Sequence, residues 1–299
     1  MVITKRTRRM RVRRNAFAGL AALAGAALMA TACSPLLTFN ALMPKDSGSA
    51  RVASADYGPL PRQGLDIYAP KAAHAGPLPV IVFIYGGSWN SGDRAGYAFV
   101  GRALAARGFV VVIPDYRLVP EIRYPAFLQD NAAAVHWARQ HIQEFGGDPA
   151  RLVLMGHSAG AYNAAMLALD PRWLGDDRAS VRGLIGLAGP YDFLPLAGPE
   201  TQAAFGGAGD LPATQPINHV SADAPPAMLA TADKDTIVRP LNSDSLARAL
   251  TAHGVTVVRV RYPGIGHVGM ITSIAKPLRG RARVLDDVIR FANQVTVKP

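Results

Sequence analysis

The stretch Val153-Leu154-Met155-Gly156-His157-Ser158-Ala159-Gly160-Ala161 decides the fold of this chain. A short apolar run, typical of a buried strand, ends in the pattern G-x-S-x-G, and an alanine-rich helical pattern follows. On such a sharp strand-to-helix turn the serine hydroxyl projects out of the sheet. The small flanking residues let the backbone bend and let strand and helix pass closely. Ser158 is therefore the candidate nucleophile, and the adjacent His157 is expected to point away from the cleft.

The rest of the chain alternates apolar runs with helical patterns, which predicts an α/β fold with a mostly parallel sheet covered by helices on both faces. Residues 190–224 are the exception, because they are rich in Gly, Pro and Ala and show no regular pattern. A structureless stretch of that length is rare, so we expect a lid or pocket wall there. The expected strands are 52–57, 65–68, 80–85, 109–113, 152–155, 184–188, 227–231 and 255–260, and the expected helices are 97–107, 125–145, 159–169, 241–253 and 284–295.

Two later loops supply candidates for a base and an acid. A serine hydroxyl needs a base to take its proton, and the base needs an acid to orient it. Such groups collect in the loops that follow the carboxyl ends of strands. The last predicted strand is followed by a Gly-rich loop that ends in His267, the candidate base, with His219 as its competitor. The strand at 227–231 leads to Asp233 and Asp235; Asp235 is preferred as the acid and Asp233 stays open.

A glycine pair after the strand at 80–85 supplies a candidate oxyanion hole. Attack on a carbonyl carbon creates an oxyanion, which needs hydrogen-bond donors already in place. Backbone N–H groups of the loop Gly86-Gly87-Ser88-Trp89 can face the cleft, with the N–H of Ala159 as their partner. Gly86, Gly87 and Ala159 are thus the predicted donors. The sequence contains no cluster of metal ligands and no G-x-G-x-x-G after a strand, so it implies no metal and no other cofactor.

The first 32 residues have the layout of an export signal. They hold seven Lys and Arg residues and no acid, so the net charge of +11 drops to +4 without them. The basic charge is therefore no sign of a nucleic-acid partner. An apolar run at 16–30 leads into Ala30-Thr31-Ala32-Cys33, which resembles a bacterial lipobox. We expect lipidation of Cys33; a plain signal peptide with an incidental cysteine, or an uncleaved anchor, is the alternative.

These features predict how the chain is divided and where the protein resides. Residues 1–32 are the expected lipoprotein signal peptide, 33–50 a tether, and 51–299 one folded domain. Cys33 is the only cysteine, which excludes a disulfide framework. The expected location is the bacterial cell envelope, with the protein anchored to the membrane by the lipid on Cys33. Ser34 after the cysteine, in place of Asp, favours the outer membrane in a cell that has two.

The chain resembles α/β-hydrolases of the carboxylesterase type, near the hormone-sensitive-lipase-like esterases, the feruloyl-esterase-like (BD-FAE) domains and the kynurenine formamidases. The similarity spans about residues 60–295. One position departs from the family, because Tyr85 stands where its H-G-G-x-W loop has histidine. Asp115, Arg117 and Asp130 are interpreted as framework residues. The motifs are Tyr85-Gly86-Gly87-Ser88-Trp89, Asp115-Tyr116-Arg117-Leu118, Pro125 with Asp130, Gly146-Gly147-Asp148-Pro149, Gly156-His157-Ser158-Ala159-Gly160, Asp235-Thr236-Ile237-Val238 and Gly266-His267.

The resemblance implies the α/β-hydrolase fold and a serine hydrolase that cleaves carboxylic esters through an acyl-enzyme. Ser158 would attack the acyl carbon, His267 would carry the proton, and Asp235 would hold the imidazolium. Apolar and small residues at 193–205 and 211–217 predict a small-molecule ester with a short acyl group. An amidase or peptidase on the same residues is one alternative. An inactive hydrolase fold that serves as a surface binding lipoprotein is the alternative of another class.

Overall fold

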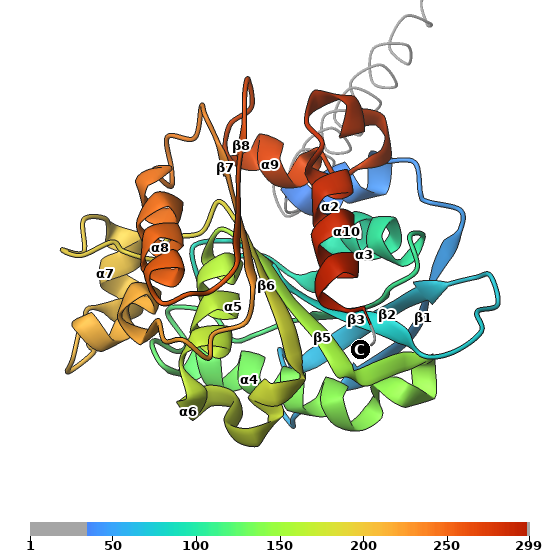
Figure 1. Ribbon diagram of the computed structural model, residues 1–299, viewed down its shortest axis with the longest axis horizontal. Coiled ribbons are helices and arrows are strands. Elements are labelled where there is room, and N and C mark those ends of the chain that lie inside the picture. The colour runs from blue at the N-terminus through green and yellow to red at the C-terminus, as the bar shows by residue number, and fades with distance from the viewer. Residues whose placement is uncertain (1–34, 298–299) are drawn as a thin grey trace, which may run out of the picture.

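The structure is a computed structural model that describes residues 35–297. The predicted signal peptide and Cys33 therefore lie outside the described residues. Helices surround a twisted sheet in the middle of the molecule (Figure 1). Within the described part, no helix is both long enough and apolar enough to cross a membrane.

The sheet has eight strands in the order β1-β2-β4-β3-β5-β6-β7-β8. The pairs β1–β2 and β2–β4 are antiparallel, and every later pair is parallel. The middle strands are continuous apolar runs because helices cover both faces of the sheet. The prediction of a mostly parallel sheet is confirmed. The strands are β1 Ser49–Asp56, β2 Gly64–Pro70, β3 Leu78–Ile84, β4 Val110–Pro114, β5 Gly147–His157, β6 Val181–Leu187, β7 Ala227–Ala232 and β8 Val257–Tyr262.

The helices form two groups on opposite sides of the sheet (Figure 1). α3 contacts α10 in one group, whereas α4, α5 and α6 contact one another in the other. Every residue of α5 is buried, because this helix lies between the sheet and its neighbours. The helices are α2 Pro35–Leu42, α3 Ala98–Ala105, α4 Ala126–His141, α5 Ala159–Leu169, α6 Pro171–Leu174, α7 Pro199–Phe205, α8 Leu241–Ala252, α9 His267–Thr272 and α10 Val284–Val295.

The predicted tether over 33–50 needs a correction, because α2 occupies much of it. Leu36 and Phe39 pack against the core, and the Phe39 ring meets Phe99 of α3 edge to face at 5.3 Å. The Asn40 side chain donates a hydrogen bond to the carbonyl of Ala95 at 3.0 Å. The apolar side chains of this segment therefore bind it to the domain, and β1 follows within a few residues.

The stability of the central sheet gives a first prediction. Leu154 of β5 is fully buried between β3 and β6, whereas Leu42 at the end of α2 is 73% exposed. Truncation of a buried leucine removes apolar contacts and leaves a cavity, so Leu154→Ala should lower the free energy of unfolding by about 2–5 kcal/mol. The matched control Leu42→Ala should change it by less than about 0.5 kcal/mol. Urea denaturation of both variants checks this, and similar losses would contradict the placement of β5 in the core.

Candidate active site

Ser158 lies in a sharp turn between β5 and α5, with φ 56° and ψ −127°. A residue with a side chain rarely adopts this left-handed backbone, so surrounding contacts must hold it. The glycines of the motif permit those contacts. A Cβ on Gly156 would lie 2.2 Å from the carbonyl oxygen of Gly160, and one on Gly160 would lie 2.1 Å from that of Ile84. The pattern G-x-S-x-G thus reflects how closely strand and helix pass.

Three side chains from three strand ends form a hydrogen-bonded chain. Oγ of Ser158 lies 2.8 Å from Nε2 of His267, and Nδ1 of His267 lies 2.7 Å from Oδ2 of Asp235. A carboxylate only accepts hydrogen bonds, so Nδ1 donates and Nε2 is left to accept from the serine hydroxyl. Asp235 follows β7, and His267 is the first residue of α9, which follows β8. The structure therefore brings these three predicted residues together.

The carboxylate of Asp235 is held in its ionised form. Burial on its own raises the pKa of Asp235, but the hydrogen bond from His267 and the backbone N–H of Val238 outweigh it and leave the pKa below its usual value. Oδ1 accepts from the N–H groups of Ile237 and Val238, both at 2.9 Å. A carboxylate anchored in this way can stabilise a positive charge on the neighbouring imidazole.

The alternative residues have other contacts. The exposed Asp233 accepts a hydrogen bond from the N–H of Gly264 at 2.8 Å, and so it fixes the loop that leads to His267. The competing His219 donates to the carbonyl of Ala213 at 2.8 Å, in the segment behind α5. Of the two loop aspartates, Asp235 is the one that contacts His267.

His157 lies behind the hydrogen-bonded chain and is buried. Its Nε2 donates to the carbonyl oxygen of His267 at 3.2 Å, and the two rings are 4.9 Å apart. Burial, reinforced by the nearby His267, lowers the pKa of His157 to about 3. The ring therefore supports the backbone of His267 without placing a second charge beside it. Sequence reasoning missed this contact, and the only signal for it is the position of His157 next to Ser158.

In the loop after β3, three consecutive residues have positive φ angles. Gly87 has φ 134°, and Ser88 and Trp89 have φ 48° and 55°. The carbonyl of Gly87 accepts from the N–H of Ser91 at 3.0 Å. Because the C=O and N–H of one planar peptide point in opposite directions, the N–H of Ser88 points away from that contact. Within residues 35–297, the N–H groups of Gly87, Ser88 and Ala159 have no acceptor at hydrogen-bond distance.

Gly86 lets this loop approach the nucleophile. A Cβ on Gly86 would lie 2.8 Å from both the Cβ of Ser158 and the carbonyl oxygen of His157. Real Cβ atoms do not approach so closely, so only glycine fits without a shift of the turn. Gly86 is a predicted donor, and its position also makes it the point of contact between the loop and the serine turn.

Tyr85, the departure from the family pattern, anchors the base of the same loop. Its hydroxyl donates to Asp115 at 2.7 Å and accepts from the guanidinium of Arg62 at 2.9 Å. Its ring stacks with Tyr97 at 5.3 Å and with Tyr116 at 4.9 Å. Asp115 thus has the framework role expected of it, and Tyr85 fixes the start of the loop that follows β3.

A cavity of about 740 Å³ opens beside Ser158. Ser88, Trp89 and Ala159 form its inner end, and the segments 190–201 and 236–242 form its sides. The predicted pocket wall is therefore confined to 190–201, because residues 211–217 pack elsewhere: Tyr162 of α5 donates to the carbonyl of Thr214. Among the predicted donors, Ala159 lines the cavity and Gly86 and Gly87 do not. Ser88 lines it and was missed, although it directly follows the glycine pair.

Comparisons with known proteins agree with this geometry. The BD-FAE family model matches residues 65–250. An esterase of Mycobacterium tuberculosis, LipC, is 32% identical over 71% of this chain and 58% of its own length. A probable isoprenylcysteine alpha-carbonyl methylesterase of Arabidopsis thaliana is 30% identical over 75% of this chain and 52% of its own. The chain thus spans between half and three-fifths of these relatives.

Solved structures share the fold. Esterase B of Lactobacillus rhamnosis in an inhibited form superposes with a TM-score of 0.77 at 22% identity, over 93% of this chain and 96% of that one. A thermostable esterase of Pseudomonas putida gives a TM-score of 0.70 at 26% identity, over 88% of each chain. The chain belongs to the BD-FAE family and has the α/β-hydrolase fold, which confirms both the resemblance and the predicted fold class.

The buried His157 gives a prediction for acid stability. The unfolded chain takes up a proton at the usual imidazole pKa of 6.5, whereas folded His157 does so only near 3. Between these values the unfolded state binds one more proton, so the free energy of unfolding falls as the pH falls. The slope from this group is about 1.4 kcal/mol per pH unit. His157→Gln should remove that slope in urea denaturation between pH 6.5 and 4, and identical slopes in variant and wild type would show that His157 is not held neutral.

Within residues 35–297 there is no group of three or more His, Cys, Asp or Glu side chains arranged to hold a metal ion.

Proposed function

We propose that this protein is a serine hydrolase that cleaves carboxylic esters. The observation that carries the proposal is the hydrogen-bonded chain Ser158–His267–Asp235, whose serine lines an open cavity. A nucleophile, a base and an orienting acid in this order are the elements of acyl transfer. The relatives named as esterase and methylesterase support the same reaction class.

Each residue has a distinct chemical task in this reaction. Nε2 of His267 takes the proton of Ser158 as Oγ attacks the carbonyl carbon, and the ionised Asp235 stabilises the imidazolium that results. The same imidazolium then gives its proton to the departing alcohol, which leaves an ester between Ser158 and the acyl group. A water molecule, deprotonated by His267, attacks this acyl-enzyme, and the acid is released with Ser158 restored.

The oxyanion hole is proposed to consist of the N–H groups of Gly87, Ser88 and Ala159. All three lack a protein acceptor among the described residues, and Ser88 and Ala159 line the cavity beside Ser158. Donors that are fixed before the reaction stabilise the developing charge without reorganisation. Gly86 stays a predicted donor, and its close contact with the serine turn is a second reason for glycine at this position.

We propose that the preferred substrates are esters with a short, uncharged acyl group. Trp89 forms a fixed inner wall, because its Nε1 donates to Asn163 at 3.1 Å and its ring packs edge to face on Phe205 at 4.8 Å. At the outer end, Ile237 and Leu241 are 65% and 58% exposed. A long acyl chain would extend to this open outer end. There each added methylene would stay in contact with water and add little binding energy.

We also propose that the protein is a lipoprotein of the bacterial envelope, anchored through Cys33. The support is the order of basic residues, apolar run and small residues before the only cysteine. The periplasmic side of the membrane would then be the place of ester cleavage.

The catalytic assignment predicts the effects of four substitutions. Ser158→Ala and His267→Ala should each lower kcat by about 10⁴-fold or more, because only the residual effect of the oxyanion hole and of substrate binding remains. Asp235→Asn should cost far more activity than its control Asp233→Asn, which removes only a loop contact. Steady-state kinetics on p-nitrophenyl acetate measures this. A larger loss from Asp233→Asn would reassign the acid, and failure of a fluorophosphonate probe to label Ser158 would favour a binding protein.

The pocket predicts the dependence on chain length. Across p-nitrophenyl esters, kcat/KM should peak between about acetyl and hexanoyl, since later methylenes would lie at the open outer end and stay in contact with water. Parallel assays on matched anilides should be slower than on the esters. A maximum on long-chain triglyceride emulsions would point to a lipase, and faster cleavage of N-formyl or anilide substrates would make the protein an amidase.

The anchor predicts the behaviour of Cys33→Ala. Without the thiol no lipid can be attached, so the protein should leave the membrane fraction or accumulate as the uncleaved precursor. Cell fractionation and intact-mass measurement of wild type and variant check this. Unchanged membrane attachment together with unchanged mass would exclude lipidation at Cys33.

A further inference from the structure

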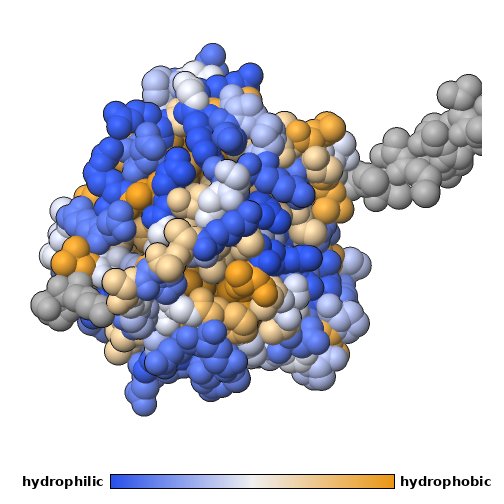
Figure 2. Space-filling model, turned by 90° about the vertical axis from the view of Figure 1, so that its right-hand side faces the viewer, coloured by the Kyte–Doolittle hydropathy of each residue, from blue (hydrophilic) through white to orange (hydrophobic). Residues whose placement is uncertain are grey.

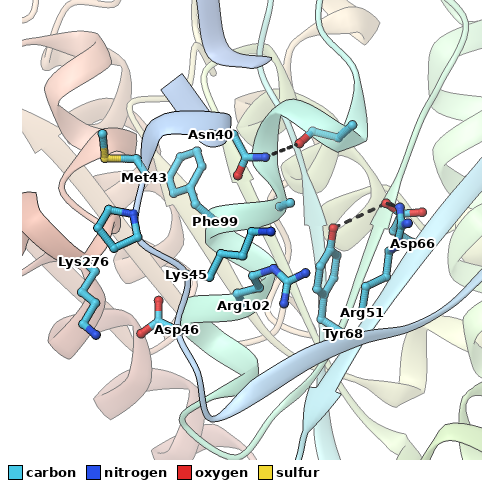
Figure 3. A pocket seen from close by; sticks show the side chains of 13 residues that line it. Asn40, Met43, Lys45, Asp46, Arg51, Asp66, Tyr68, Phe99, Arg102 and Lys276 are labelled. Carbon is cyan, nitrogen blue, oxygen red and sulfur yellow. Dashed lines mark hydrogen bonds and ion pairs between the residues drawn. The ribbon is translucent and has the colours of Figure 1, made fainter. Parts of the chain in front are cut away.

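A second cavity, of about 190 Å³, lies on another part of the domain and is lined by basic side chains. It is enclosed by the end of α2 and the residues after it, by β1 and β2, by α3, and by Lys276 near the end of the chain (Figure 3). On the face of the molecule drawn in Figure 2, hydrophilic and hydrophobic residues are interspersed. None of the residues of the proposed esterase site line this cavity.

The charges in this cavity are not balanced. Four basic and two acidic side chains line it, which leaves a formal charge of +2. Three of the basic groups, Lys45, Arg102 and Lys276, have no carboxylate at ion-pair distance among the described residues. Lys45 and Arg102 both reach toward the middle of the cavity in Figure 3. Lys45 and Lys276 are exposed and Arg102 is half-buried, so the cavity presents its positive charge to anions from solution.

The two carboxylates do not neutralise these three groups, because each is already paired. Asp66 is bound by Arg51 and by Arg94, both at 3.2 Å. Asp46 is bound by Arg279 at 2.7 Å. Arg94 and Arg279 do not line the cavity. Because they pair with Asp66 and Asp46, the lining residues keep an excess of positive charge.

The walls of the cavity are held in place before any ligand binds. The hydroxyl of Ser49 donates to the carbonyl of Arg102 at 2.8 Å and so ties β1 to α3. The pair Arg279–Asp46 ties the Lys276 segment to the loop before β1. The guanidinium of Arg102 lies over the ring of Tyr68, 5.9 Å from its centre, which limits its movement. A site with fixed walls loses less entropy when it binds an anion.

We propose that this cavity binds a phosphate group. Its volume admits one tetrahedral anion with a small substituent, and its excess charge matches a phosphate ester. Arg and Lys are the side chains that bind phosphate oxygens best. The phosphate could belong to a soluble compound or to a phospholipid headgroup. The cavity is lined by Asn40 and Met43, a few residues after Cys33, and thus lies near the membrane if Cys33 carries a lipid.

Calorimetric titration of the full chain in a nonionic detergent, at constant ionic strength, tests this proposal. The probes are inorganic phosphate and monomeric dihexanoyl phosphatidylglycerol, with dihexanoyl phosphatidylcholine, which is zwitterionic and has no net charge, as the reference. Wild type should bind at least one of the two anions saturably. Binding of inorganic phosphate identifies a soluble source, and binding of phosphatidylglycerol alone identifies a headgroup.

Variants locate the binding. Arg102→Gln and Lys276→Gln should each raise the Kd about tenfold, whereas Arg182→Gln, an exposed arginine of β6, should leave it unchanged. Lys276 is exposed and has no ion-pair partner within residues 35–297, so its variant stays informative if Arg102→Gln disturbs folding. Unfolding midpoints without ligand serve as the check on folding. The proposal is overturned if neither anion saturates, if phosphatidylcholine binds as tightly as phosphatidylglycerol, or if Lys276→Gln and the control bind equally.

Discussion

The contact between the start of α5 and the strands β3 and β5 is the constraint on which the site depends. Gly160 lies so close to the carbonyl of Ile84 that even a methyl group would not fit. This approach forces Ser158 into a left-handed backbone and directs its hydroxyl away from the sheet. The strain is tolerated because the buried helix α5 and the central strands leave the turn no other conformation.

Around that turn, a layer of buried polar contacts positions the loops that carry the other groups. Asp115 accepts hydrogen bonds from the hydroxyl of Tyr85 and from the backbone N–H of Arg94. It thereby fixes the start of the loop that contains Ser88. On the opposite side, the backbone of His267 rests on the neutral ring of His157. The proposed nucleophile, base and donors are therefore each held by a second residue, as preorganised catalysis requires.

The fold separates two kinds of chemistry. The open cavity beside Ser158 lies where the segments after β3, β5, β6 and β7 meet, and its walls contain many apolar residues. The smaller basic cavity is built from α2, α3 and the first strands, around charges that the protein itself leaves unbalanced. The carboxylates near the two cavities have opposite uses. Asp235, which lies outside the lining of the open cavity, faces the imidazole that it stabilises, whereas Asp46 and Asp66 line the basic cavity and are paired by arginines.

The local pattern of the sequence by itself determined the order of the eight strands and of five helices, the bounds of α5 and α10, and Ser158 on its turn, because burial on both faces and the G-x-S-x-G spacing are visible along the chain. The helices α2, α6, α7 and α9 were not predicted. Contacts between distant segments were decided only by the tertiary structure. Asp233 and Asp235 are alike in sequence, and only the register of β7 beside β8 turns Asp235 toward His267. The segment 33–50, predicted to be a tether, contains the helix α2, whose Phe39 packs on Phe99. The basic cavity arises because Lys45, Arg102 and Lys276, from three separate segments, line the same cavity. Which charges share a site depends on tertiary structure, and no local pattern records it.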